Sequence, residues 1–205
     1  MKLYLASGNP HKAVELQALA DALRAPGQGP AIEILSAAAV GGMPEVVEDT
    51  GTFVGNARKK ALALRALLPE GAWALADDSG LCVAALGGAP GVESAYYAGP
   101  ESNPRANLDK LVRVMESVPD GQRSAEFVCV LFLAGPNGSE KHFEGRVRGR
   151  LARLPGGSGG FGYDPLFIPE GFTATLAEVP AEVKNRVSHR ANAFAACVGW
   201  LAAGG

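Results

Sequence analysis

The chain lacks most features that would place it outside the ordinary globular proteins. It has only three cysteines, Cys82, Cys129 and Cys197, and no two of them have CxxC spacing. This pattern predicts reduced, buried thiols rather than a disulfide framework or a zinc site. No apolar run approaches the roughly 20 residues of a membrane-spanning helix, and the one at the N-terminus is too short for a signal peptide. We therefore expect a cytoplasmic protein without a membrane partner.

A surplus of basic residues is also missing. The 205 residues carry a formal net charge of −2. Proteins that hold a nucleic-acid backbone normally carry a basic surplus, so we expect no nucleic-acid polymer as a partner. The charge is uneven along the chain, because residues 1–103 hold 7 basic and 11 acidic side chains, whereas residues 104–205 hold 12 and 10. The acidic surplus of the first half of the chain therefore suits a metal ion, and the basic surplus of the second half suits an anionic ligand.

Apolar periodicity predicts alternating strands and helices within a single domain over residues 1–205. The expected strands are Lys2–Ala6, Ala31–Leu35 and Ala72–Ala76, followed by a long hairpin of Phe127–Ala134 and Lys141–Arg150, in which alternation places Arg146, Arg148 and Arg150 on one face. The expected helices run from Ala13 to a break at Pro26–Gly27, from Thr52 to about Leu68, from Ser102 through Met115, and from Ser188 through Trp200. Thr52 is expected to cap the second of these helices. Because the hairpin is antiparallel, we expect an α/β fold with a mixed sheet rather than a doubly wound parallel one.

The first polar cluster, Ser7–Lys12, lies between an expected strand and an expected helix. Backbone amides at a helix start, with a lysine one turn inside, suit phosphate binding. The Walker A spacing is absent. A plain strand-to-helix turn with a solvated Lys12 explains this stretch equally well when it is taken alone.

Two acidic clusters follow, Glu48–Asp49 and Asp77–Asp78. Adjacent carboxylates repel each other unless a cation or a proton neutralises them, so such pairs can hold Mg²⁺. The alternative is an Asp-rich turn whose side chains cap nearby amides. The apolar run before Asp77 favours the functional interpretation, because it predicts a central strand that ends at this pair.

The last cluster is the glycine-rich stretch Gly159–Pro165, followed by Lys184 and Ser188–Arg190. Glycines let a backbone approach a ligand closely, and an aromatic ring can stack on a base. Lys184, His189 and Arg190 supply hydrogen-bond donors for phosphate or carbonyl oxygens. Singly, each has a structural explanation. Taken with the other clusters, they predict a Mg²⁺-dependent nucleotide hydrolase.

These stretches resemble the inosine triphosphate pyrophosphatase family, and the resemblance covers nearly the whole chain. In order, the matching stretches are Ser7–Lys12, Thr52–Ala57 with Lys60–Ala61, Ala76–Leu81, Gly87–Ala95, Gly159–Pro165 and Ser188–Arg190. Each stretch is a weak signal alone, but their shared order and spacing are highly specific.

The resemblance implies Mg²⁺-dependent hydrolysis of ITP, XTP and their deoxy forms to the monophosphate and pyrophosphate, which removes deaminated purines from the nucleotide pool. It also implies a two-lobed fold around a long mixed β-sheet flanked by helices, with a cleft between the lobes, and a homodimer. The sequence leaves open which of these nucleotides is preferred and how guanine is rejected.

The same resemblance assigns roles to individual residues. Asp78 is expected to accept a proton and, together with Glu48, to hold the metal ion. The residues expected to bind the triphosphate, nucleoside and base are Ser7, Gly8, Asn9, Pro10, His11, Lys12, Ser79, Phe161, Gly162, Tyr163, Asp164, Lys184, His189 and Arg190.

One position departs from the family pattern. The family commonly carries Glu before the Asn-Ala pair of its second stretch, whereas this chain carries Gly55. Asp49 also competes with Glu48 as the second metal carboxylate, although the spacing to Phe53 favours Glu48. Two alternatives stay open: a metal-dependent nucleotide hydrolase with another base preference, and a non-catalytic nucleotide-binding module if Gly55 marks a degraded site.

Overall fold

The computed structural model describes residues 1–23 and 31–204, which form two compact units. Unit 1 comprises Met1–Asp78, Cys129–Gly145 and Arg190–Gly205, and unit 2 comprises Ser79–Val128 and Arg146–His189. The chain passes between the units four times, because a unit boundary lies within each of three long strands and another lies at the start of the last helix. Each unit is described by itself below.

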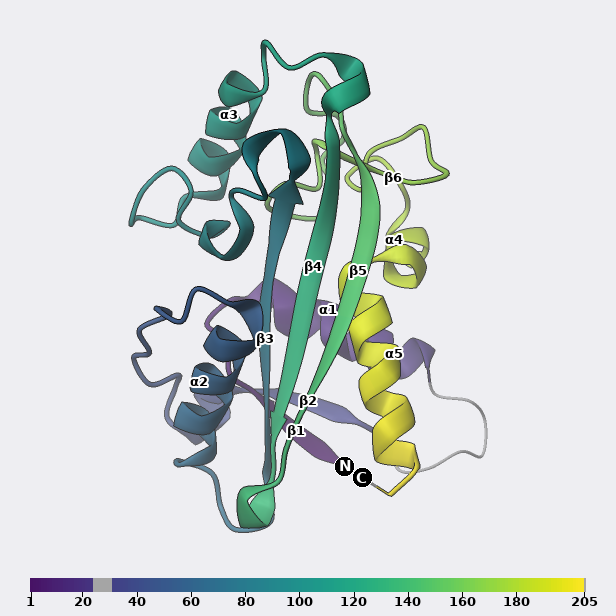
Figure 1. The fold of residues 1–205 in the computed structure, drawn as a ribbon. Coiled ribbons are helices and arrows are strands. Elements are labelled where there is room, and N and C mark those ends of the chain that lie inside the picture. Colours follow the sequence, from purple (N-terminus) through teal and green to yellow (C-terminus); the bar gives the residue numbers. More distant parts are fainter. Residues whose placement is uncertain (24–30, 205) are drawn as a thin grey trace. The chain divides into compact units, whose positions relative to one another are not determined.

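The described strands belong to a six-stranded mixed sheet of order β2-β1-β3-β4-β5-β6 (Figure 1). Their bounds are β1 Lys2–Leu5, β2 Glu33–Ser36, β3 Trp73–Val83, β4 Ser124–Ala134, β5 Glu140–Leu151 and β6 Phe167–Pro169. Strand β1 pairs in parallel with β2 and β3, whereas β5 and β6 are antiparallel. The expected α/β fold with a mixed sheet is therefore confirmed.

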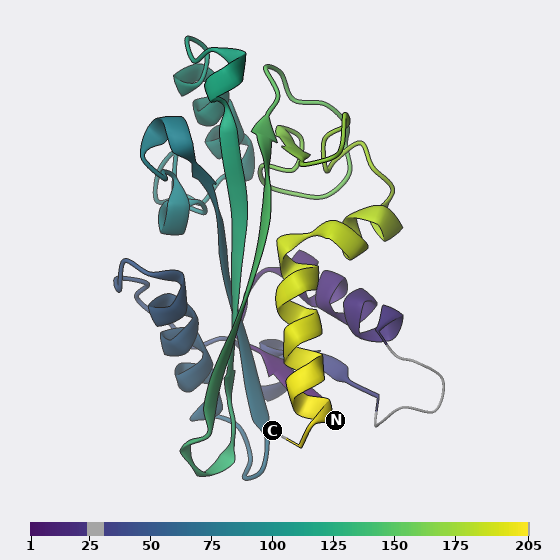
Figure 2. The same cartoon turned by 45° about the vertical axis from the view of Figure 1, so that its right-hand side comes forward.

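In unit 1, alternate strand residues supply two separate cores. The side chains of Leu3, Leu5 and Leu75 pack with helices α1 (Pro10–Ala22) and α5 (His189–Ala202). Ala74 and Ala76, on the other face of β3, pack with helix α2 (Phe53–Arg65). Since successive strand residues point to opposite faces, α2 lies on one side of these strands and α1 and α5 lie on the other (Figure 2).

Unit 2 has a single core on one face of its strand segments. Leu81 and Val83 from β3 and Phe127 from β4 pack with helix α3 (Pro104–Val114) and with the turns around Leu166. Arg123 is buried, and its guanidinium donates to the carbonyls of Met115, Val118, Leu151 and Ala152. One side chain thereby joins the end of α3 to the end of β5. The short helix α4 (Ala181–Val187) precedes α5.

Several predictions from sequence are confirmed at the level of elements. The hairpin is present as β4 and β5, and the exposed residues of β5 include Arg146, Arg148 and Arg150, all on one face. Thr52 caps α2 by accepting a hydrogen bond from Gly55 N at 3.1 Å. None of the helices in the described ranges is long and apolar enough to span a membrane.

Other predictions need correction. The third strand does not end at Asp77 but continues through Val83, so both aspartates lie inside it. Strand β2 begins two residues later than expected, and α4 and β6 have no counterpart in the sequence prediction. Cys82 is only half-buried. The expected break at Pro26–Gly27 lies outside the described residues.

Candidate active site

The turn between β1 and α1 is organised by its own side chains. Ser7 Oγ accepts a hydrogen bond from Asn9 N at 3.1 Å, and Asn9 Oδ1 accepts one from His11 N at 2.9 Å. Asn9 is thus the N-cap of α1 and Pro10 is its first residue, which are the residue types favoured at these positions. Gly8, Pro10 and His11 are exposed. The turn is therefore accessible at the start of α1, while the amides of Asn9, His11 and Lys12 already donate hydrogen bonds within it.

Asp77 and Asp78 do not form one pair of ligands. They are consecutive residues of β3, so their side chains leave opposite faces of the strand. Asp77 contacts residues of α1 and α5, whereas Asp78 contacts α2. The interpretation of Asp77–Asp78 as one metal-binding pair at a strand end is therefore wrong, because the strand continues and its pleat separates the two carboxylates.

Asp77 is the centre of a buried ion network in unit 1. Its carboxylate accepts from Arg190 Nε at 2.6 Å and from Lys12 Nζ at 2.5 Å. Arg190 Nη1 also donates to Glu15 Oε2 at 2.7 Å. Burial alone would raise the pKa of Asp77, but the charges of Arg190 and Lys12 hold that pKa well below its usual value. This network ties α1, β3 and α5 together.

Asp78 belongs to a second network, built around Lys60 of α2. Lys60 Nζ donates to Asp78 Oδ1 at 2.7 Å and to Glu48 Oε2 at 2.7 Å. Burial raises the pKa of Asp78 to about 6, with Glu48 adding to the effect and Lys60 opposing it. The two carboxylates outweigh burial at Lys60 and raise the pKa of its ammonium, which stays charged.

The residues around Asp78 fit a hard divalent cation. Asp78 Oδ2 is buried and has no hydrogen-bond partner among the described residues, so one carboxylate oxygen is available to a ligand. Glu48 and Asp78 already converge on one positive charge, that of Lys60 Nζ. The described residues hold no group of three or more His, Cys, Asp or Glu side chains that could bind a metal alone. Two carboxylates suit Mg²⁺, which commonly completes its shell with water and substrate phosphates.

The structure also separates Glu48 from Asp49. Asp49 accepts from Lys59 Nζ at 2.6 Å and is largely exposed, whereas Glu48 shares Lys60 with Asp78. The two carboxylates therefore differ in their lysine partners, and Glu48 is the one that lies beside Asp78.

The glycine-rich stretch of unit 2 is held by Asp164. Asp164 Oδ2 accepts from Phe161 N at 2.8 Å and from Lys184 Nζ at 2.9 Å. Lys184 Nζ also lies 4.9 Å from the centre of the Phe161 ring, within the range of a cation–π contact. These contacts join Phe161 and Asp164 to Lys184, which follows them by about 20 residues in the sequence, in one cluster. Phe161 is half-buried.

Several of the remaining predicted residues make contacts within the protein that stabilise its fold. The Tyr163 hydroxyl donates to Ser94 O at 2.8 Å, and burial raises its pKa. The His189 ring stacks on Phe127, with 4.7 Å between ring centres. Gly162 is half-buried with φ +62°, and Ser79 is half-buried on β3. Arg190, expected to bind the base, lies in unit 1 with its guanidinium in the Asp77 network.

Sequence reasoning missed the roles of three members of these networks. It named Lys60 only within a matching stretch, interpreted Asp77 as half of a metal-binding pair, and did not name Glu15. Lys60 carried a detectable signal, since it shares a helix face with the buried residues Ala57, Ala61 and Leu64. A lysine in such a row requires a buried partner. Glu15 occupies a similar position in α1, next to buried Leu16.

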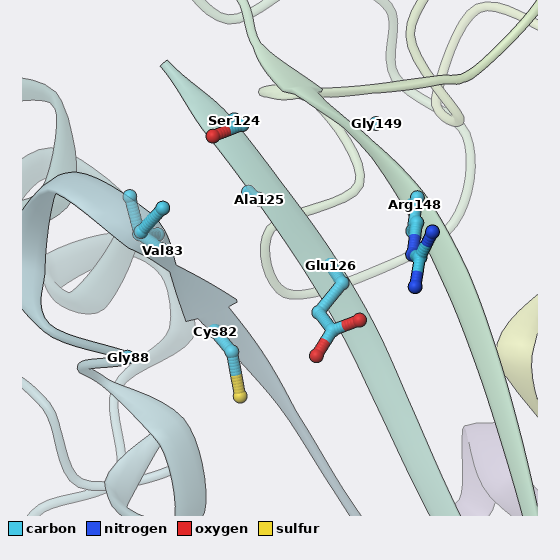
Figure 3. A pocket seen from close by; sticks show the side chains of 9 residues that line it. Cys82, Val83, Gly88, Ser124, Ala125, Glu126, Arg148 and Gly149 are labelled. Carbon is cyan, nitrogen blue, oxygen red and sulfur yellow. The ribbon is translucent and has the colours of Figure 1, made fainter. Parts of the chain in front are cut away.

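A cavity of about 320 Å³ lies elsewhere in unit 2, on the face of the strands that carries Cys82, Glu126 and Arg148 (Figure 3). None of its lining residues was predicted for the site. The predicted site residues lie in the polar clusters of unit 1 and of unit 2 described above, each considered by itself.

Comparison with known proteins gives consistent matches over the whole chain. The model of the Ham1 family matches residues 3–200. A protein of Opitutus terrae named dITP/XTP pyrophosphatase is 63% identical over 200 residues, which cover 98% of each chain. A protein of the same name from Streptomyces coelicolor is 46% identical, and the match covers 96% of this chain and 95% of the relative.

Solved structures match as well. The Staphylococcus aureus Ham1 protein has a TM-score of 0.83 at 32% identity, with both chains covered completely. A structure titled nucleoside-triphosphatase / dITP/XTP pyrophosphatase, from Mycobacterium abscessus, has a TM-score of 0.74 at 39% identity and covers 97% of this chain and 99% of its own. The resemblance drawn from the motifs and the prediction of a nucleoside-triphosphate pyrophosphatase are both confirmed by these matches.

Proposed function

The chain belongs to the Ham1 family, and on that premise we propose that it hydrolyses ITP, dITP, XTP and dXTP to the monophosphate and pyrophosphate in a Mg²⁺-dependent reaction. Its role would be to remove deaminated purines from the nucleotide pool. The observation that carries the proposal is the convergence of Glu48 and Asp78 on Lys60, with Asp78 Oδ2 left without a hydrogen bond. The names of the relatives support the same activity.

We assign the metal site to Glu48 and Asp78. Bound Mg²⁺ would neutralise charge on the phosphate oxygens and lower the pKa of a coordinated water. Lys60 Nζ lies 2.7 Å from an oxygen of each carboxylate, so Glu48 and Asp78 are already close together before a cation binds. Asp78 would accept the proton of the attacking water, and because its pKa is about 6 the carboxylate is ionised at neutral pH.

The triphosphate is assigned to the start of α1. Ser7–Lys12 forms a turn with exposed residues at the positive end of the α1 dipole, and Lys12 adds a positive charge that is shared with Asp77. The positive end of a helix dipole and a lysine cation stabilise phosphate charge. The proposed reaction needs no nucleophile from the protein, because water is the attacking group. Attack by water at the α-phosphorus, with pyrophosphate as the leaving group, is consistent with this set of residues.

The nucleoside and base are assigned to Phe161–Asp164, Lys184 and His189 of unit 2, with Ser79 as a further contact. Arg190 is left out of this assignment, because its guanidinium is buried in the Asp77 network of unit 1. Hypoxanthine and xanthine present a carbonyl at C6, where adenine presents an amino group. Donors fixed by Asp164, such as Lys184 Nζ, would pair with that carbonyl and lose this partner with adenine. A site built in this way can discriminate by factors of about 10⁴–10⁵.

The test is pyrophosphate release from ITP and XTP against ATP and GTP, with and without Mg²⁺. We expect pyrophosphate rather than single phosphates, dependence on Mg²⁺, and a kcat/KM for ITP far above that for ATP. Equal values for ATP and ITP would contradict the base assignment. Binding of ITP with Mg²⁺ but without turnover would instead favour the non-catalytic module.

Asp78→Asn tests the assignment of the catalytic carboxylate. We expect turnover to fall by at least about 10²-fold, because the proton acceptor and one metal carboxylate are lost together. Asp49→Asn is the matched control, since Asp49 is a carboxylate next to Glu48 that pairs with Lys59 outside this network. Activity retained in Asp78→Asn would overturn the assignment.

The homodimer implied by the family resemblance stays a proposal, and light scattering during size-exclusion chromatography would test it.

A further inference from the structure

The segment that carries Glu48 is attached to the first turn of α2. Thr50 donates twice to Asn56 Oδ1, from its backbone N at 3.2 Å and from Oγ1 at 2.7 Å. Asn56 is 2% exposed, so the acceptor is fixed inside the protein. Thr52, the N-cap of α2, completes the attachment through its bond from Gly55 N. Four residues after Asn56, the same helix presents Lys60 to the Glu48 carboxylate.

Gly55 makes room for this attachment. A Cβ built on Gly55 would lie 2.3 Å from Thr50 Oγ1 and 2.7 Å from Thr50 Cβ. A rotamer change of Thr50 could move Oγ1, but Cβ is fixed to the backbone, so a side chain at position 55 requires the segment itself to shift. Glycine within a helix costs about 1 kcal/mol relative to alanine, so helix propensity does not explain its presence here. The contact with Thr50 does.

We propose that Thr50, Gly55 and Asn56 form a positioning latch that fixes Glu48 beside Asp78 for the divalent cation. Asn56 binds the backbone N–H of Thr50, two residues after Glu48, and Lys60 binds the Glu48 carboxylate. Helix α2 therefore fixes both the backbone beside Glu48 and the end of its side chain. Gly55, which departs from the family pattern, is then a requirement of this chain's site and not a mark of a degraded one. The proposal rests on the proposed function only in the assignment of Glu48 as a metal ligand.

Two variants test the latch, and two readouts separate position from stability. Gly55→Ala places a Cβ against Thr50, and Asn56→Ala removes the Oδ1 atom that accepts both hydrogen bonds from Thr50. The first readout is the affinity for Mn²⁺ alone, by electron paramagnetic resonance without nucleotide, since carboxylates that bind Mg²⁺ also bind Mn²⁺. The second is the hydrogen-exchange protection of the Thr50 amide. We expect each variant to weaken Mn²⁺ binding by about 10–100-fold, as for other residues that orient metal ligands, and to lose that protection.

Controls are available within unit 1. Gly199→Ala is the matched substitution, because Gly199 is also helical but has open space around its Cα, so Mn²⁺ affinity and Thr50 protection should not change. Thr50→Gly combined with Gly55→Ala removes the two Thr50 atoms that clash and keeps the backbone bond to Asn56, so that only Thr52 Oγ1, 2.8 Å from the added Cβ, still has to move. This double variant should recover most of the Mn²⁺ affinity that Gly55→Ala loses.

The outcomes separate this inference from the proposed function. Gly55→Ala and Asn56→Ala proteins that bind Mn²⁺ like the unaltered protein would overturn the latch, whether or not Thr50 loses protection. Failure of the double variant to recover affinity, in a protein that unfolds at the same urea concentration as the unaltered one, would also overturn it. An unaltered protein that binds Mn²⁺ yet releases no pyrophosphate would contradict the proposed function alone.

Discussion

At the scale of single residues, Asp77 and Asp78 show how position decides chemistry. The two side chains are identical and adjacent, yet the pKa of Asp77 is well below its usual value and that of Asp78 is raised to about 6. Both are buried, so burial does not separate them. Asp77 faces two cations, whereas Asp78 shares one cation with a second carboxylate. The first residue is therefore suited to holding the fold and the second to binding a ligand.

We expect Asp77→Asn to lower the free energy of unfolding by about 3–5 kcal/mol, because removal of one partner from a buried ion pair leaves the other charge poorly compensated. Arg190 is 1% exposed and would keep only Glu15 as a carboxylate partner in that network. Urea denaturation followed by circular dichroism measures the loss.

The neighbouring Asp78→Asn variant is the control for this prediction. Asp78→Asn removes the ion pair with Lys60, but Lys60 keeps Glu48. The pKa of Asp78 is raised to about 6, so its ionised form is disfavoured in the fold at neutral pH, and the unfolding midpoint should stay near that of the unaltered protein. Equal destabilisation by the two substitutions would contradict the division of roles between the aspartates.

At the scale of elements, the glycine-rich stretch of unit 2 has a defined conformation. Gly160 has φ +67°, and a Cβ there would lie 2.2 Å from Asp164 Oδ2, the atom that binds Phe161 N and Lys184. Gly157 has φ +78°, and its Cβ would lie 2.4 Å from Ala177 O. The glycines therefore serve close backbone packing that places Phe161 and Lys184, and they are not a flexible filler.

Gly157→Ala should destabilise the protein by more than about 2 kcal/mol, since a positive φ costs roughly 1–2 kcal/mol for alanine and overpacking adds a further cost of about 1–3 kcal/mol. Gly171→Ala is the matched control, because Gly171 has φ +82° but open space around it. The stability lost in Gly171→Ala should be confined to about 1–2 kcal/mol of backbone strain. Thermal unfolding of the two variants compares them directly, and equal losses would show that packing against Ala177 contributes nothing.

At the scale of the whole molecule, the three cysteine thiols differ in how deeply they are buried in the two units. Cys129 and Cys197 lie in the buried core of unit 1, and Cys82 is half-buried in unit 2. Burial raises the pKa of Cys197 to about 12 and that of Cys129 well above its ordinary value. Burial also raises the pKa of Cys82. A raised pKa keeps a thiol protonated and therefore slow to react.

We expect one thiol of the native protein, Cys82, to react slowly with a disulfide reagent at pH 8. The other two should react only after denaturation, when their pKa values return to about 8.5. Absorbance of the released thiolate counts the reactive groups, and Cys82→Ser should abolish the native reaction. Three thiols reacting at one rate in the native protein would contradict the burial of Cys129 and Cys197.

The elements were predictable where local periodicity decides them. The β4–β5 hairpin, the N-cap at Thr52 and the last helix follow from apolar spacing, a turn and capping residues. The course of β3 past Asp77 was not predictable in this way, because polar residues in a strand signal its end unless buried partners compensate them. Those partners, Lys12, Arg190 and Lys60, are distant in sequence.

The sequence by itself determined the family, the α/β class and the set of residues that could form the site, because motif order and apolar periodicity are properties of the chain. Only the tertiary structure decided which carboxylates work together. It placed Asp77 with Arg190 and Asp78 with Glu48, and it gave Gly55 a neighbour in Thr50. The physical reason is that charge pairing and steric fit depend on distances in space, which residue type and spacing do not specify.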